Sequence, residues 1–348
     1  MIRRLTVVTA AVAIPAAIGQ LFVGRGADRL LDAPRTMPGE EELGPRIDAL
    51  GGEVVRLRSR DGIKLGGRWL PAEGPADGWA PDPHEAIILL HGWSGSIAPD
   101  LVEYGPFLRR TAGVLGLDFR GHGSSDPGLT TFGYQEVDDV AGALAWLGER
   151  GVTRVALAGT SMGGMTALAS IVVLGDGSLP SADLDPDAPA HDLAAPPPRI
   201  VAAVADSVGP ELTTAVANRI RAPFRGFLAA RMFDVAARRI GADLRATEPI
   251  RVVGLIETVP LLLVHGEADR TVPLRDGRRL AAAAGPNAEH WIIPDAGHSA
   301  GHATEPAAYE ARVERFLRAA FSDARAAVPI IARQPAGEPR SGSAGEGH

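Results

Sequence analysis

Short apolar runs recur along the chain and are separated by longer stretches with helical spacing. Runs of four to eight apolar residues bounded by turn residues are typical of strands buried on both faces of a parallel sheet. Helical spacing is clearest over residues 135–149 and 165–173. The alternation of the two patterns predicts an α/β sheet. The predicted strands are residues 86–90, 113–118, 155–158, 200–205, 260–264 and 290–293.

Two further strands are predicted ahead of this series. Residues 54–59 and 63–70 flank the dipeptide Asp61-Gly62. Asp-Gly is typical of the tight turn of a β-hairpin, because both residues tolerate a positive φ. These first two strands are therefore expected to form a hairpin.

The N-terminal region contains the longest apolar run. Residues 5–24 carry no charge and follow Arg3 and Arg4, an arrangement typical of a signal peptide or a membrane anchor. About 20 residues can just span a bilayer, but Pro15 and Gly19 weaken the helix. Cleaved export, an uncleaved anchor and an apolar helix packed on the domain all stay open. We expect the main domain to lie outside the cytoplasm.

Other regions depart from the alternating pattern. Residues 25–51 are interpreted as a linker, and residues 323–348 as a flexible tail. Residues 175–199 are rich in Pro and Asp and predict a surface loop. Residues 210–251 have a helical pattern and are locally basic, with eight Arg against four acidic residues.

Composition excludes several classes of protein. The chain has no Cys, which rules out disulfides, thiolate metal sites and a Cys nucleophile. Its 35 basic residues are 34 Arg and one Lys, Lys64, which lacks the context of a phosphate-binding loop. The net charge of -7 offers no basic field for nucleic acid. We therefore expect no nucleic-acid partner.

The strongest local motif surrounds Ser161. The sequence Gly159-Thr160-Ser161-Met162-Gly163 follows a predicted strand and opens a predicted helix. A serine in such a strand–turn–helix elbow needs small residues two positions to either side, because the sharp turn brings those neighbours together. Gly159 and Gly163 meet that need, so Ser161 is the candidate nucleophile.

A serine nucleophile needs a base, and the base needs a carboxylate to orient it. Asp269 and His298 each follow a predicted strand, and the order Ser, Asp, His is that of the α/β-hydrolase triad. Glu267 is a rival acid and His302 a rival base, both with less typical surroundings. His298 and His302 are four residues apart, but no acid completes a zinc motif there. We expect no metal and no cofactor.

These motifs resemble those of the α/β-hydrolase superfamily over roughly residues 52–322. The resemblance includes His91-Gly92 and the segments 118–125, 133–136 and 161–164. It is closest to bacterial members grouped with serine aminopeptidases, monoacylglycerol lipases and small esterases. It implies an α/β fold with an eight-stranded, mostly parallel sheet flanked by helices and a helical cap inserted after strand six. The cap would be residues 210–257, between core segments 52–209 and 258–322.

In this fold two backbone N–H groups bind the oxyanion, one after the nucleophile and one in the loop after the third strand. The matching donors are Met162 and Trp93. His91 and His122 are interpreted as structural residues of the loops around the site.

The resulting expectation is a serine hydrolase that cleaves a carboxylic ester through an acyl-enzyme. A serine peptidase acting on short peptides is the first alternative, and a non-catalytic hydrolase-like binding protein is the second. Perhydrolase and carbon–carbon hydrolase chemistry use the same triad and stay open. The expected partners are a small-molecule ester or a short peptide, together with a membrane through residues 5–24.

Overall fold

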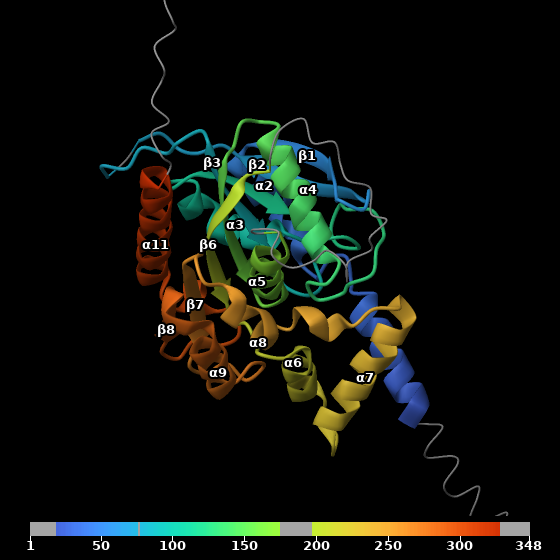
Figure 1. The fold of residues 1–348 in the computed structure, drawn as a ribbon. Helices are drawn as coiled ribbons and strands as arrows, with labels where there is room; N and C mark the ends of the chain where they lie inside the picture. The colour runs from blue at the N-terminus through green and yellow to red at the C-terminus, as the bar shows by residue number, and fades with distance from the viewer. Residues whose placement is uncertain (1–18, 76, 175–196, 328–348) are drawn as a thin grey trace, which may run out of the picture.

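An eight-stranded sheet forms the centre of the molecule in the computed structural model, which describes residues 19–75, 77–174 and 197–327. The strand order is β1-β2-β4-β3-β5-β6-β7-β8. β2 pairs antiparallel with β1 and β4, and all other neighbours are parallel (Figure 1). The strands are β1 (Glu53–Arg58), β2 (Lys64–Leu70), β3 (Glu85–Leu90), β4 (Gly113–Leu117), β5 (Arg154–Thr160), β6 (Arg199–Asp206), β7 (Leu261–Gly266) and β8 (Ala288–Ile293).

Every strand predicted from the sequence is present, with boundaries that differ by a few residues at most. β3, β4 and β7 are buried at every position, which is why they have continuous apolar runs in place of alternation. Successive side chains of a strand point to opposite faces. Ile88 and Leu90 accordingly join one core, and Ile87 and Leu89 join the other.

Helices cover both faces of the sheet. The first core includes residues of α4 (Glu136–Gly148), α5 (Met162–Leu174) and α9 (Leu274–Ala284). The second core includes residues of α3 (Ala98–Leu108) and α11 (Pro306–Ala326). α11 lies on the far left of the sheet in Figure 1, opposite α4. This three-layer arrangement confirms the predicted α/β-hydrolase sheet.

The chain between β6 and β7 is helical. It contains α6 (Leu212–Arg219), α7 (Arg225–Ile240), η3 (Leu244–Thr247), α8 (Pro249–Val252) and η4 (Val253–Leu255). α7 buries Ala229, Met232, Phe233 and Ala236, which lie at helical spacing on one face. The ring of Phe233 packs against Phe132 at a centroid distance of 5.3 Å.

The linker expected at residues 25–51 was wrong for much of its length. Residues 19–31 form a helix, followed by η1 (Glu40–Leu43) and α2 (Gly44–Leu50). Ala27, Leu30 and Leu31 are buried, and this apolar stripe at helical spacing was hidden among Arg, Asp and Gly. Within the described part of the chain, the structure has no helix long and apolar enough to cross a membrane.

The first residues of the tail expected from residue 323 are helical. α11 continues to Ala326, because Ala324 is buried and Arg325 donates hydrogen bonds to both carboxylate oxygens of Glu85, at 2.8 and 2.6 Å. The rest of that tail, most of the loop expected at residues 175–199 and most of the apolar run 5–24 lie outside the described residues.

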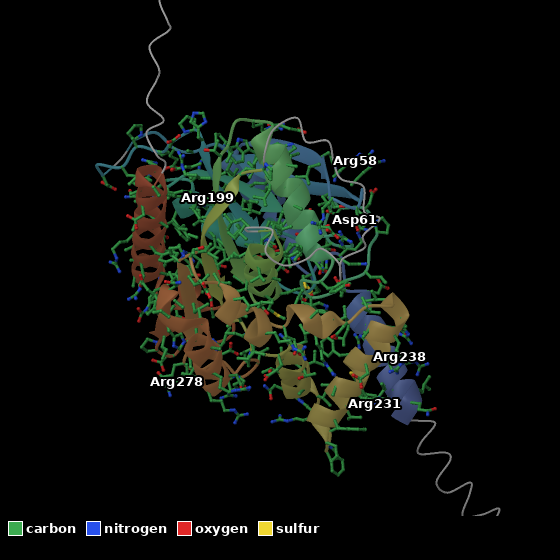
Figure 2. The ribbon with its side chains drawn as sticks, in the orientation of Figure 1. Arg58, Asp61, Arg199, Arg231, Arg238 and Arg278 are labelled. Atoms are coloured by element: carbon green, nitrogen blue, oxygen red, sulfur yellow. The ribbon has the colours of Figure 1, made fainter. Side chains whose placement is uncertain are left out.

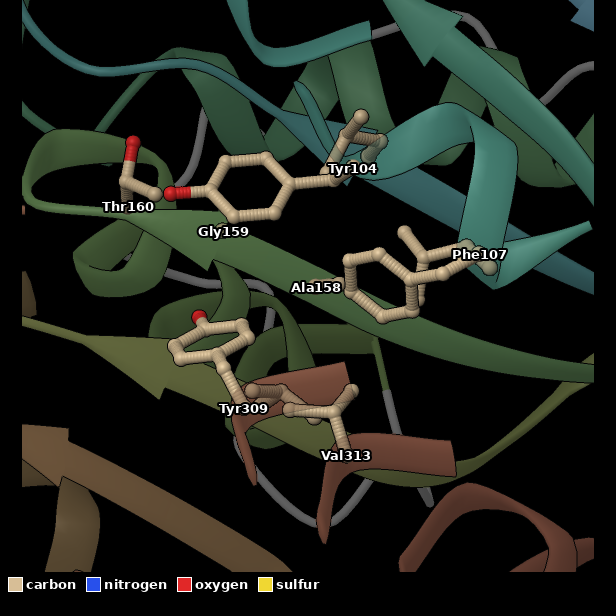
Figure 3. A pocket seen from close by; sticks show the side chains of 10 residues that line it. Tyr104, Phe107, Ala158, Gly159, Thr160, Tyr309 and Val313 are labelled. Atoms are coloured by element: carbon tan, nitrogen blue, oxygen red, sulfur yellow. The ribbon is translucent and has the colours of Figure 1, made fainter. Parts of the chain in front are cut away.

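A small apolar pocket lies between α3, β5 and α11 (Figure 3). Tyr104, Phe107, Tyr309 and Val313 line it, with Gly159 and Thr160 at the end of β5. Its volume of about 20 Å³ can hold one water but no acyl chain. The pocket therefore belongs to the core behind the Ser161 turn.

A buried ion-pair cluster around Arg120 holds the turn of the β1–β2 hairpin against α4. The Arg120 guanidinium is 1% exposed and donates to Asp139 at 2.7 and 3.0 Å and to Asp61 at 2.7 and 2.9 Å. Asp61 belongs to the turn predicted from the Asp-Gly dipeptide, and Figure 2 labels it beside Arg58. Arg120 thus connects the hairpin turn with α4.

Replacing Arg120 with Met is expected to destabilise the protein by about 3–5 kcal/mol, because the fully buried Asp139 carboxylate loses its partner. The measurement is the free energy of urea unfolding, with the exposed Arg58→Gln as control. A loss no larger than that of the control would show that this ion pair does not hold the hairpin.

Candidate active site

The turn between β5 and α5 carries Ser161 in a backbone conformation that few non-glycine residues adopt. Its φ is 50°, in the left-handed region. A Cβ on Gly159 would lie 2.4 Å from the backbone carbon of Gly163, and a Cβ on Gly163 would lie 2.1 Å from the carbonyl oxygen of Leu90. Neither position has room for a side chain. The glycine spacing read from the sequence therefore has a direct steric cause.

Asp269 lies in the loop that follows β7. Its Oδ1 accepts hydrogen bonds from the backbone N–H groups of Thr271 and Val272, both at 2.8 Å. Its Oδ2 lies 2.7 Å from Nδ1 of His298. The carboxylate is buried, and its two backbone donors hold one oxygen so that the other faces the imidazole.

His298 lies in the loop after β8 and contacts both of the other predicted residues. Its Nε2 is 3.1 Å from Oγ of Ser161. A proton on Nδ1 donates to Asp269, which leaves Nε2 of the neutral imidazole free to accept from the serine hydroxyl. The structure thus brings Ser161, His298 and Asp269 into one hydrogen-bonded row.

The rival residues lie elsewhere. Glu267 is exposed. His302 lies between Oε1 of Glu103 at 3.0 Å and Oε1 of Glu310 at 3.2 Å, and its ring stacks on Phe107. The two carboxylates and the aromatic ring give His302 a structural setting away from Ser161.

The loop after β3 lies beside the nucleophile. A Cβ on Gly92 would come within 3.8 Å of the Ser161 Cβ. His91 accepts a hydrogen bond at Nε2 from the Phe119 N–H and donates from Nδ1 to the Gly92 carbonyl. Burial lowers the pKa of His91 to about 3, with the nearby His122 adding to the effect. A neutral His91 therefore sets the conformation of this loop.

The two predicted oxyanion donors directly follow Ser161 and Gly92 in the chain. Met162 is the first residue of α5, and the first N–H groups of a helix have no acceptor within the helix. Trp93 follows Gly92, and its indole N–H donates to the Leu30 carbonyl at 3.2 Å. The loop after β3 is thereby tied to the helix at residues 19–31.

Sequence reasoning missed a second polar group beside the site. Asp206 ends β6, and its carbonyl accepts the Ser161 N–H at 2.8 Å. Its carboxylate accepts hydrogen bonds from the hydroxyls of Ser207 at 2.8 Å and Tyr309 at 3.0 Å. The Ser207 Oγ in turn accepts the backbone N–H of Ser299 at 2.8 Å.

The Asp206–Ser207 group joins the turn that carries Ser161 to the loop that carries His298, because Ser299 directly follows His298. Ser207 and Ser299 both have a positive φ, of 58° and 52°. Burial raises the pKa of Asp206, and the hydrogen bonds from Ser207 and Tyr309 oppose that rise. The only sequence signal was an Asp-Ser dipeptide after a strand, which has no motif of its own.

Ser207→Ala is expected to lower kcat about 10-fold while leaving KM nearly unchanged, because Ser299 loses its acceptor and His298 shifts. Steady-state kinetics with the best substrate found for the protein would measure this split. Ser170→Ala is the control, since that buried hydroxyl has no partner among the described residues. Equal kinetics for the two variants would refute a positioning role for Ser207.

Comparison with known proteins shows to which family the chain belongs. Residues 87–312 match the model of the alpha/beta hydrolase family. That is well over half of the chain, and the protein belongs to this family. The chain is 27% identical over 267 residues to the uncharacterized protein YfhR of Escherichia coli O157:H7, covering 75% of this chain and 78% of that one. It is 26% identical over 250 residues to the uncharacterized protein YqkD of Bacillus subtilis, covering 69% and 74%.

Solved structures show the same fold. The esterase Pf2001 of Pyrococcus furiosus superposes with a TM-score of 0.59 at 21% identity, covering 84% of this chain and 98% of that one. An alpha-beta hydrolase of Vibrio vulnificus superposes with a TM-score of 0.57 at 17% identity, covering 86% and 92%. At these identities the likeness concerns the fold. Family membership supports hydrolase activity in general.

Proposed function

We propose that the protein is a serine hydrolase that cleaves a carboxylic ester through an acyl-enzyme. The observation that carries this assignment is the continuous row from Ser161 Oγ to His298 at 3.1 Å and from His298 to Asp269 at 2.7 Å. Such a row converts a weak hydroxyl nucleophile into an effective one at neutral pH.

Each residue has a defined role in the proposed reaction. Ser161 Oγ attacks the ester carbonyl carbon while His298 Nε2 takes its proton, and Asp269 stabilises the imidazolium. The N–H groups of Met162 and Trp93 bind the oxyanion. His298 then protonates the departing alcohol, which leaves the acyl group on Ser161. Water, deprotonated by His298, attacks that acyl group, and the His298 imidazolium returns the proton to Ser161 Oγ as the acid is released.

Two observations favour an ester substrate. The chain resembles small esterases and lipases, and the superposed Pyrococcus furiosus protein is named an esterase. α6, within the proposed cap, contacts the loop that carries Asp269, since Asn218 donates to the Thr271 carbonyl at 3.0 Å. The whole proposed cap, residues 210–257, is rich in Ala, Leu, Val and Phe, which suits an apolar acyl or alcohol group.

Labelling by a fluorophosphonate probe tests the nucleophile. The native protein is expected to be labelled and Ser161→Ala to be unlabelled, with the exposed Ser322→Ala as control. Absence of labelling in a folded native protein would favour the non-catalytic binding alternative.

Asp269→Asn is expected to lower kcat about 10⁴-fold, because the imidazole loses its correct tautomer.

A substrate panel separates the esterase from the peptidase. Short- and long-chain p-nitrophenyl esters are expected to give higher kcat/KM values than aminoacyl p-nitroanilides. The measurement is steady-state release of nitrophenol or nitroaniline, with Ser161→Ala as the background. A higher kcat/KM for the anilides would assign the site to peptide hydrolysis.

A further inference from the structure

The turn between α6 and α7 and the first turn of α7 each expose a large aromatic side chain. Phe224 is 83% exposed and Phe227 is 66% exposed. Phe224 also has a φ of 56°, a left-handed conformation that costs a non-glycine residue of order 1 kcal/mol. Solvent alone gives no reason to keep a phenylalanine in that position.

The same turn is basic. Arg221 and Arg225 are exposed on either side of Phe224. Neither takes part in an ion pair with any residue that the structure describes. Arg231 and Arg238 lie farther along α7, where Figure 2 labels them, and Arg231 pairs with Asp234 at 3.1 Å. Arg221 and Arg225 are therefore the cationic groups that flank the Phe224 ring without an ion-pair partner among the described residues.

The helix at residues 19–31 adds apolar surface to this lobe. Leu21 and Phe22 are 54% and 48% exposed. The helix packs on α7, since a Cβ on Gly26 would meet Met232 and since Arg239 pairs with Asp28. In Figure 1 the residue-19 end of this helix and the α6–α7 turn both lie at the lower end of the molecule.

We propose that this docking tip binds the surface of an anionic lipid bilayer. It comprises Leu21, Phe22, Arg221, Phe224, Arg225 and Phe227. Phe and Leu side chains enter the boundary between headgroups and acyl chains, while Arg side chains keep their charge among the phosphates. In the sequence, Leu21 and Phe22 lie near the end of the charge-free apolar run 5–24, whose composition suits a bilayer. This favours lipid over a protein partner.

Docking would also orient the candidate active site. α6 contacts the loop that carries Asp269 through the hydrogen bond from Asn218 to Thr271, and the exposed turn directly follows α6. The surface that meets the lipid therefore adjoins the part of the site that holds Asp269. An ester dissolved in the bilayer would reach the site without crossing bulk water. Docking itself uses no catalytic group and is independent of the proposed hydrolysis.

The absence of Cys allows a clean test with the chain of 348 residues. Phe227→Cys and, separately, Val54→Cys are labelled with an environment-sensitive fluorophore. Val54 is 64% exposed on β1, so it matches Phe227 in exposure while lying at the other end of the molecule (Figure 1). Vesicles contain phosphatidylcholine alone or phosphatidylcholine with phosphatidylglycerol, with and without brominated lipid.

With phosphatidylglycerol vesicles, the label at position 227 is expected to shift to the blue and to be quenched by brominated lipid, and the label at position 54 is not. Adding Arg221→Gln and Arg225→Gln is expected to weaken docking roughly 5-fold for each Arg. Ser161→Ala in the labelled protein should dock as strongly as its parent, which separates docking from catalysis.

Three results would overturn lipid docking by the tip. The first is an unchanged label at position 227 when vesicles are present. The second is an equal response at position 54, which would indicate unfolding on the vesicle. The third is a blue shift that needs no vesicle and grows with protein concentration, which would assign the tip to a second copy of the chain.

Discussion

The close approach of backbone around Gly159 and Gly163 is the constraint on which the candidate site depends. Gly163 comes so near the Leu90 carbonyl that no side chain fits, and the chain must reverse within one residue. That reversal places Ser161 at φ 50° with its hydroxyl at the carboxyl edge of the sheet. Because β5, β6, β7 and β8 are parallel neighbours, the residues that follow them meet at this one edge.

Hydrogen bonds from residues with no proposed role in the reaction hold these loops together. Asp206 bonds the Ser161 N–H through its carbonyl and reaches Ser299 through the Ser207 hydroxyl. His91 holds the loop after β3 in the same way, through Phe119 and Gly92. Such supporting contacts keep the reacting groups within a fraction of an ångström of their working geometry.

Local patterns predicted much of this structure. Continuous apolar runs predicted buried strands because both faces of the parallel strands are covered by helices. The elbow was readable because its cause is local, namely two glycines around one serine. The helix at residues 19–31 and the Asp206 group were missed for the opposite reason. Leu30 and Leu31 are buried only where their helix meets distant parts of the chain, since their carbonyls accept hydrogen bonds from Trp93 and Thr130. Asp206 gains its partners from the Ser161 turn and from Tyr309 of α11.

The sequence by itself determined the fold class, the order of the candidate nucleophile, acid and base, and the glycines of the turn, because each depends on residues close in the chain. Tertiary structure decided which candidate acid and which candidate base lie beside Ser161. Asp269 and His298 meet Ser161, whereas Glu267 faces solvent and His302 pairs with Glu103 and Glu310. Tertiary structure also decided which apolar side chains are exposed to solvent. Phe224 and Phe233 look alike in the sequence, and only packing against Phe132 buries one while the turn exposes the other.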